Sequence, residues 1–444
     1  MAMSDVKIPK RISTALVNSL GSGVTPRVGL EYMAVGRKAE IETLLGDLAN
    51  ISEGGSVFRF IVGRYGSGKS FLLQIIRNYA MERNYVVTDA DLSPERKLTG
   101  NKGNGLATYR ELMQNLSTRV RSDGGAISSI LEKWMSSIQM SVMKDLNMTP
   151  SDPEFLRQVE IRTMEAIHNM DSMVHGFDFA KVLTMYFYAC RNGSDEQKNA
   201  ALKWLRGEYS TKTEAHTELG VRVIIDDDTW FDYIKLLSAF VRELGYAGFV
   251  MLIDEGVNLY KISNPIARSN NYEKLLMMFN DAMQGKAMGL GIYMGGTPQF
   301  IEDNRRGLFS YEALRTRLAT SRFLKDGIRD MQSPLLYLEK LTHEEIFVLL
   351  KKILEIHTQH YEYMSAVTEE NLLAFMQVVA SRIGADELLT PREIIRDFMG
   401  ILNVMRQNPA IDFNGMLTGD LFKTSRNDDE KMDDDDSDSA VFTL

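Results

Sequence analysis

The chain has 444 residues, of which 44% are hydrophobic and 25% charged, proportions typical of a soluble globular protein with two or three domains. A single cysteine, Cys190, excludes an intramolecular disulfide and metal clusters built on thiolates, and fits a reducing cytosol. The net charge is −9, and no stretch approaches the roughly 18 consecutive apolar residues of a membrane span, so we expect a cytoplasmic protein.

The first strongly patterned region is a predicted buried strand at 57–62, followed by a glycine-rich loop and a helical apolar rhythm at 72–76. The loop fits G-x-x-x-x-G-K-[ST], in which small residues let backbone N–H groups surround a di- or triphosphate at a helix N-terminus. Its predicted cofactor-binding residues are Gly63, Arg64, Tyr65, Gly66, Ser67, Gly68, Lys69 and Ser70. Lys69 would reach the β- and γ-phosphates, and Ser70 would be a ligand of Mg²⁺.

A second strand is predicted at 85–89, and about 150 residues separate it from the next one, far more than a single crossover requires. Amphipathic patterns at 127–135 and 155–161 predict an inserted helical subdomain at about 100–220. Before it lies a glycine-rich basic loop at 93–105, which is either a solvated loop or a contact with DNA phosphates. The residues that would contact DNA are Arg96, Lys97 and Lys102.

The next predicted strand, at 248–253, delivers two carboxylates at its C-terminal end, where doubly wound sheets place their sites. Asp254 is suited to hold Mg²⁺, and Glu255 is suited to polarise an attacking water. Alone, the pair would fit a strand that ends in a solvated acidic turn better than a catalytic site. Its combination with a phosphate loop favours the catalytic interpretation.

A further strand at 291–297 ends on Thr297, whose hydroxyl could hydrogen-bond the γ-phosphate or the water. Ordinary turn chemistry of the Gly-Gly-Thr-Pro sequence is the alternative. A helix then carries Arg315 and Arg317, which could stabilise phosphoryl charge from a neighbouring subunit. A solvated or salt-bridged helix face is the alternative there.

The last part of the chain is predicted to be helical. Residues 341–346 have a threonine cap and a glutamate three positions on, which indicates the start of a helix. On that helix His357 and His360 lie three residues apart, but no carboxylate or thiolate completes a metal site, so we expect them to be solvated or packed.

The end of the chain is strongly acidic. Residues 428–438 carry eight acids and one base, and the remaining chain has 50 basic and 52 acidic residues, a net charge of −2. We expect 427–444 to be a disordered, solvated tail, with 440–444 as an alternative docking peptide. Acidity of the whole chain therefore does not argue against a face that binds nucleic acid.

The order of these motifs resembles that of AAA+ ATPases of the origin-recognition and Cdc6-like branch, from residue 30 to about 400. Besides the phosphate loop and the Asp-Glu strand, the resemblance rests on V-G-R-x-x-E at 35–40 and T-P-R-E-I-I-R at 390–396. It implies ATP and Mg²⁺ as cofactors and α/β architecture with a parallel sheet, a helical insertion and a C-terminal helical lid. The cofactor-binding residues that it adds are Val35, Gly36 and Arg37, beside adenine, and Arg392, a lid arginine that contacts the nucleotide of its own subunit.

More narrowly, T-P-R-V-G-L at 25–30 and I-D-E-G-V-N-L-Y at 253–260 resemble the BrxD family of ATP-binding proteins in bacterial BREX phage-defence systems. The implied domains are an N-terminal clasp at 1–33, a nucleotide-binding core at 34–335 and a lid at 336–426.

Two functions are compatible with this resemblance. One is an ATPase that self-associates through its ATPase interface and handles DNA or regulates a helicase-like defence partner. The other is a nucleotide-gated protein adaptor with slow or incidental turnover.

Overall fold

The computed structural model describes residues 7–168, 173–319, 329–381 and 390–418. The chain divides into two compact units, one made of Thr25–Thr342 and the other of Met1–Val24 together with His343–Leu444. The acidic tail predicted at 427–444 lies outside the described residues.

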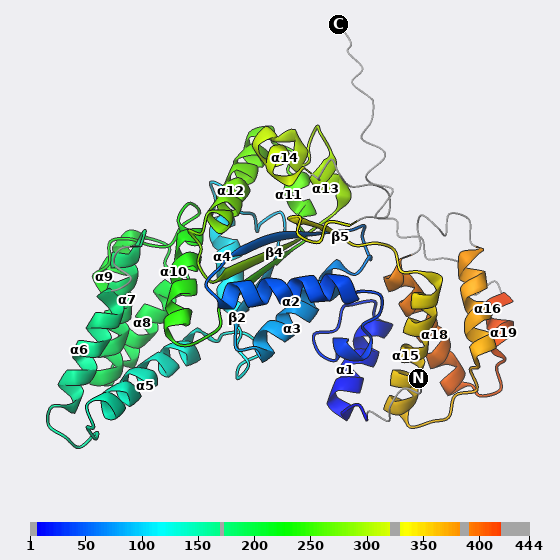
Figure 1. Cartoon of the computed structure of the whole chain (residues 1–444), viewed down its shortest axis with the longest axis horizontal. Helices are drawn as coiled ribbons and strands as arrows, with labels where there is room; N and C mark the ends of the chain where they lie inside the picture. The colour runs from blue at the N-terminus through cyan, green and yellow to red at the C-terminus, as the bar shows by residue number, and fades with distance from the viewer. Residues whose placement is uncertain (1–6, 169–172, 320–328, 382–389, 419–444) are drawn as a thin grey trace, which may run out of the picture. The chain divides into compact units, whose positions relative to one another are not determined.

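The larger unit is built on a five-stranded sheet whose pairs are all parallel (Figure 1). The strands are β1 (Val57–Val62), β2 (Val86–Asp91), β3 (Phe249–Asp254), β4 (Leu290–Gly296) and β5 (Leu335–Tyr337), in the spatial order β2-β3-β4-β1-β5. This arrangement confirms the predicted α/β fold with a parallel sheet core.

Side chains of β1 alternate between the two faces of the sheet, as the two-residue period of a strand requires. Phe58 and Phe60 join a core cluster with residues of α4 (Asn104–Gln114), α10 (Trp230–Glu243) and α12 (Pro265–Met283). Ile61 joins a second cluster with residues of α2 (Lys38–Ser52) and α3 (Lys69–Glu82). Helices thus cover both faces, which is why β1 and β4 are buried along their whole length.

The long connection between β2 and β3 is helical, as predicted. Besides α4 and α10, its helices are α5 (Ile127–Asp145), α6 (Phe155–His168), α7 (Gly176–Asn192), α8 (Asp195–Leu205) and α9 (Lys212–Leu219). Shorter elements of this unit are η1 (Leu30–Tyr32), α11 (Val257–Tyr260), α13 (Pro298–Glu302), η2 (Leu308–Ser310) and α14 (Glu312–Leu318).

The smaller unit joins the two ends of the chain. Helix α1 (Lys10–Gly21) packs against α15 (His343–Tyr361) and α18 (Pro391–Gln407), and α16 (Glu369–Ala380) packs against α15 and α19 (Phe413–Thr418). Thr390 and Glu393 form a reciprocal capping box at the start of α18. The division into clasp, core and lid stays a prediction.

The two histidines of α15 are buried in this unit and have polar partners. The Nδ1 of His360 lies 3.0 Å from the Ser13 hydroxyl of α1, and the Nδ1 of His357 lies 2.9 Å from the Tyr363 hydroxyl. Burial lowers the pKa of both imidazoles and so favours their neutral form. Within the described residues no group of three or more His, Cys, Asp or Glu side chains could hold a metal ion.

No helix in the described part of the chain is both long and apolar enough to cross a bilayer.

Candidate nucleotide site

The strand order brings three loops to one edge of the sheet. Strand β4 lies between β1 and β3, so its end is flanked by the phosphate loop on one side and by the two carboxylates on the other. The backbone N–H of Gly63 donates to the carbonyl of Gly296 (3.0 Å), and that of Gly256 donates to the carbonyl of Gly295 (3.0 Å). The predicted residues of all three loops therefore share the carboxyl edge, where parallel sheets bind ligands.

The phosphate loop depends on its glycines. A Cβ atom at Gly63 would lie 2.3 Å from the Ser67 hydroxyl, so a larger residue fits there only if Ser67 moves. Gly66 and Gly68 have φ angles of 73° and 99°, the left-handed region that glycine adopts readily. Gly68 is also the N-cap of α3, so the loop opens directly onto the N-terminus of that helix.

Two polar groups of the loop are placed for a phosphate. The ammonium of Lys69 donates to the carbonyls of Gly63 and Arg64, at 2.9 Å each. The Ser67 hydroxyl is buried and has no hydrogen-bond partner among the described residues. A buried hydroxyl without a partner is costly, and a phosphate oxygen in the loop would satisfy it. The residues present therefore fit a nucleotide phosphate.

The predicted Mg²⁺ ligands lie in direct contact. The Ser70 hydroxyl donates to Oδ2 of Asp254 at 2.5 Å, and the other oxygen of Asp254 accepts the backbone N–H of Glu255 at 2.8 Å. A hydroxyl and a carboxylate are the hard oxygen ligands that Mg²⁺ takes, together with waters and phosphates of the substrate. The pair fits a single Mg²⁺ ion.

Glu255 has an unusual backbone. Its φ angle is 56°, the left-handed region that residues other than glycine rarely adopt. The side-chain amide of Asn258 in α11 donates to the carbonyls of Leu92 (2.8 Å) and Glu255 (3.3 Å) and so fixes this turn to the end of β2. Strain of this kind persists where surrounding contacts impose it, most often at functional sites.

Thr297 lies at the end of β4, as predicted, and it also takes part in the turn that was the alternative interpretation. Its hydroxyl oxygen accepts the backbone N–H of Phe300 (3.2 Å) and caps α13, with Pro298 in the first turn. The hydroxyl hydrogen is not used in this bond, so the group can still donate to a ligand.

The V-G-R segment lies against the phosphate loop through Arg37. Arg37 is 6% exposed, and its guanidinium donates to the carbonyls of Ser67 (3.2 Å) and Glu339 (2.8 Å), while NH1 lies 3.6 Å from the carboxylate of Glu40. Glu40, which is buried, is also paired with Arg329 at 3.0 Å. Arg37 thus acts as a brace of the loop. Contact of adenine with Val35 and Gly36 stays a prediction.

The two arginines of α14 differ in their partners. Arg317 donates from Nε to Oδ1 of Asn280 in α12 and from NH1 to the carbonyl of Ala313, both at 2.8 Å. Arg315 is exposed, and its guanidinium has no hydrogen bond or ion pair with a described residue. Arg392 lies in the first turn of α18 in the smaller unit, and its role at the nucleotide stays a prediction.

The basic loop at 93–105 is tightly held. Arg96 pairs with Glu111 (3.3 Å) and donates to the carbonyl of Asp91 (2.9 Å). The side chain of Asn271 accepts the backbone N–H groups of Leu98 and Thr99, and that of Asp227 accepts those of Gly103 and Leu106. Arg96 is thus engaged within the fold, and contact of Lys97 and Lys102 with DNA stays a prediction.

Sequence reasoning missed Asp91 at this edge. It ends β2 and pairs in register with Asp254. Desolvation, and next to it the negative charges of Asp254 and Glu255, raise the pKa of Asp91 to about 6. The strand was predicted to end at Asp89, and an acid two residues later on the same side was the available signal.

The sequence matches the model of a known family. The family described as "BREX system ATP-binding protein BrxC/D" matches residues 8–420. No curated protein matches the sequence.

Proposed function

The chain belongs to the family of BREX system ATP-binding proteins BrxC/D, and from this premise we propose that it hydrolyses ATP to drive a DNA-handling step of phage defence. The observation that carries the proposal is the contact of Ser70 with Asp254 beside the strained Glu255, next to a loop that presents Lys69. This set has a phosphate cradle, a place for Mg²⁺ and a carboxylate for a water, the parts that phosphoryl transfer to water requires.

In the proposed reaction, water attacks the γ-phosphorus in line with the bond that breaks, the one to the oxygen shared with the β-phosphate. Glu255 orients this water and takes its proton, and ADP and phosphate leave. Lys69 turns from the loop carbonyls to the β- and γ-phosphates, and the Thr297 hydroxyl donates to the γ-phosphate or the water. Ser70 and Asp254 would hold Mg²⁺, which neutralises phosphate charge when bound.

Charge on the transferring phosphoryl group also needs a cation from outside this set, which we assign to an arginine of a neighbouring copy. Of the two arginines of α14, Arg315 suits this role better, because its guanidinium is exposed and Arg317 is bonded to Asn280. Arg317 then fixes the end of α14 and thereby positions Arg315.

The experiment compares Lys69→Ala with Glu255→Gln in the full chain, by calorimetric titration with ATP and Mg²⁺ and by phosphate release. Lys69→Ala should lose nucleotide binding, because the loop loses the ammonium that meets the phosphates. Glu255→Gln should keep binding and lose turnover, because an amide keeps the shape but cannot accept the proton. Lys212→Ala on α9, an exposed lysine, is the matched control.

Equal loss of ATP affinity in both variants would remove the division of roles between them. Turnover by Glu255→Gln at the rate of the unmodified protein would contradict the proposed hydrolysis. In that case nucleotide binding without catalysis, the adaptor function, is what the site supports.

A further inference from the structure

The segment between α4 and α5 ends in an unusual tip. Val120 is 95% exposed, and it lies between Arg119 and Arg121, both exposed. An exposed valine would have little effect on the stability of a flexible loop, but this loop is held in place by specific contacts.

Two backbone hydrogen bonds close the loop at its base. The N–H of Gly125 donates to the carbonyl of Gln114 (2.7 Å), and that of Ala126 donates to the carbonyl of Leu116 (2.8 Å). Gly124 has a φ of 97°, and a Cβ atom there would lie 2.6 Å from the Gln114 carbonyl. The return of the chain therefore requires glycine, and it brings the ends of the loop together.

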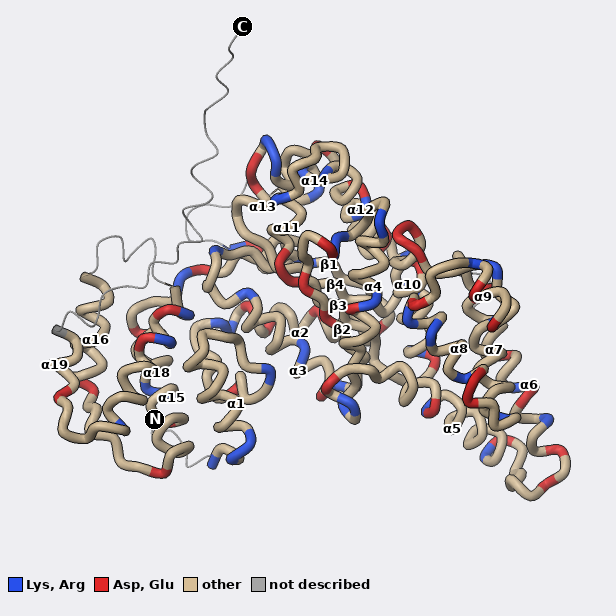
Figure 2. Tube along the Cα trace, turned by 180° about the vertical axis from the view of Figure 1, so that it is seen from behind, with Lys and Arg blue, Asp and Glu red and all other residues tan. Residues whose placement is uncertain are grey.

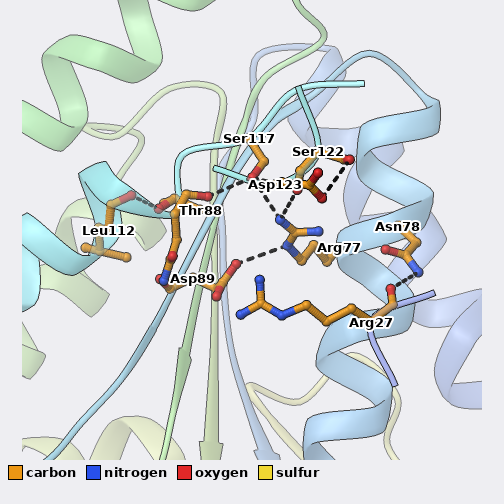
Figure 3. Close-up of polar contacts among 10 residues, drawn as sticks. Arg27, Arg77, Asn78, Thr88, Asp89, Leu112, Ser117, Ser122 and Asp123 are labelled. Atoms are coloured by element: carbon orange, nitrogen blue, oxygen red, sulfur yellow. Dashed lines mark hydrogen bonds and ion pairs between the residues drawn. The ribbon is translucent and has the colours of Figure 1, made fainter. Parts of the chain in front are cut away.

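A buried arginine fastens this base to the sheet and to the phosphate-loop helix (Figure 3). Arg77 of α3 is 3% exposed; its Nε donates to Asp89 in β2 (3.0 Å), and NH2 donates to the Ser117 hydroxyl (2.8 Å) and the Ser122 carbonyl (2.9 Å). Ser117 also exchanges both backbone hydrogen bonds with Val87 of β2. The loop thus extends the edge of the sheet and is held rigidly there.

The tip itself is a closed turn, 118–121. The N–H of Thr118 donates to the carbonyl of Arg121 (2.9 Å), and the N–H of Arg121 donates back to the Thr118 hydroxyl (3.2 Å). Nε of Arg121 donates to the Gly124 carbonyl (3.0 Å), which orients its guanidinium. Arg119 has no hydrogen bond or ion pair with a described residue. A fixed turn therefore presents an exposed valine with one arginine on each side of it.

We propose that the 118–121 turn contacts duplex nucleic acid, with Arg119 and Arg121 on backbone phosphates and Val120 against the bases at the groove. Guanidinium groups bind phosphate in a bidentate manner, and apolar side chains serve as wedges at base steps in the minor groove. The arginines are two residues apart, at most about 7 Å along the chain, a span of neighbouring phosphates rather than of distant ones. The proposal rests on the DNA-handling function above and names its surface.

Charge elsewhere supports a local contact of this kind. Figure 2 shows basic and acidic residues interspersed along the chain in both units. Interspersed charges of both signs attract a polyanion weakly over long range, so specific cations on a preformed support must supply the contact. The 118–121 turn presents such cations on a fixed support. The loop at 93–105 suits this contact less, because its Arg96 is paired with Glu111.

The test measures binding of a labelled duplex by fluorescence anisotropy with ATP and Mg²⁺, over a series of salt concentrations. The double variant Arg119→Ala with Arg121→Ala should lower affinity and flatten the slope of log K against log salt by about 1.8, since each phosphate contact contributes roughly 0.9. Val120→Ser should weaken duplex binding with the slope unchanged, because an apolar contact releases no counterions. Its effect should be smaller on a single strand of equal length.

The matched control removes the same charge elsewhere in the connection between β2 and β3, with Arg157→Ala on α6 and Arg222→Ala between α9 and α10, both exposed. It should keep the slope of the unmodified protein. An unchanged slope in the turn variant, with duplex binding by the unmodified protein intact, would overturn this surface and leave the DNA-handling function standing. Absence of duplex binding by the unmodified protein at low salt would overturn both. Loss of a protein partner from the turn variant with an unchanged slope would make the turn a protein contact and overturn the proposal.

Discussion

Arg77 and Arg315 are the same residue type used in opposite ways. Arg77 is buried between α3, β2 and the 117–124 loop, and its N–H groups are occupied by a carboxylate, a hydroxyl and a carbonyl. Arg315, at the end of α14, is exposed, and no described residue accepts a hydrogen bond from its guanidinium. A guanidinium with five donors holds a fold together when they are filled from within, and is available to an outside anion when they are not.

The substitution with the largest expected effect is Arg315→Ala. We expect turnover to fall by about 10³-fold or more, the usual effect of removing an arginine that acts across an interface. Thermal stability should not change, because the side chain has no partner among the residues that the structure describes. The measurements are phosphate release and a melting curve on the same sample.

Mixing provides the control for that result. Arg315→Ala protein keeps Lys69, and Lys69→Ala protein keeps Arg315, so co-assembly should rebuild a fraction of complete sites and restore part of the activity. If no mixing ratio restores turnover although sedimentation shows that the two variants assemble, Arg315 does not act across an interface.

The opposite result is expected for Arg77→Met. Removing the arginine leaves Asp89 and the loop carbonyl without their donor, and breaking a largely buried pair costs about 3 kcal/mol. All three tryptophans, Trp134, Trp204 and Trp230, lie in the larger unit, so their fluorescence during urea unfolding reports on that unit. Arg83→Met, an exposed change at the end of the same helix, should leave the midpoint nearly unchanged. Equal urea midpoints for both variants would mean that Arg77 does not stabilise the larger unit.

Arg317→Ala should have the smallest effect, because this residue is intermediate between the other two. It is exposed, yet two of its donors are bonded, so we expect a loss of about 1 kcal/mol of stability and a reduction in turnover of only a few-fold. Asn280→Ala removes the partner and should reproduce that reduction. If Arg317→Ala abolishes turnover as Arg315→Ala does, while Asn280→Ala does not, the two arginines have been assigned in the wrong order.

The features that the sequence predicted correctly are those encoded over short distances. The strand, loop and helix around Lys69 follow from residue types within about 20 positions, as do the carboxylates at the end of β3 and the start of the helix predicted at 341–346. The helical character of the 150-residue connection followed from apolar periodicity.

Features that depend on pairing between distant segments were not predictable. Asp91 became visible as a neighbour of Asp254 only through the register of β2 against β3. The contact of Ser13 with His360 joins residues 347 positions apart, and no local pattern marks either as a partner. Arg77 lies on the predicted helix after the phosphate loop, where the sequence alone would indicate a solvated arginine. Its burial follows only from the packing of β2 and the 117–124 loop around it.

The left-handed backbone of Glu255 sets stability and activity against each other at one position. Glycine would adopt φ 56° with less strain, and asparagine tolerates this region better than glutamate does. Substitution of Glu255 by either residue should therefore yield a protein that melts later and cannot activate water. A lineage released from the need for hydrolysis would be expected to drift toward such residues here, so the identity of residue 255 is an inexpensive marker for telling active members of the family from inactive ones.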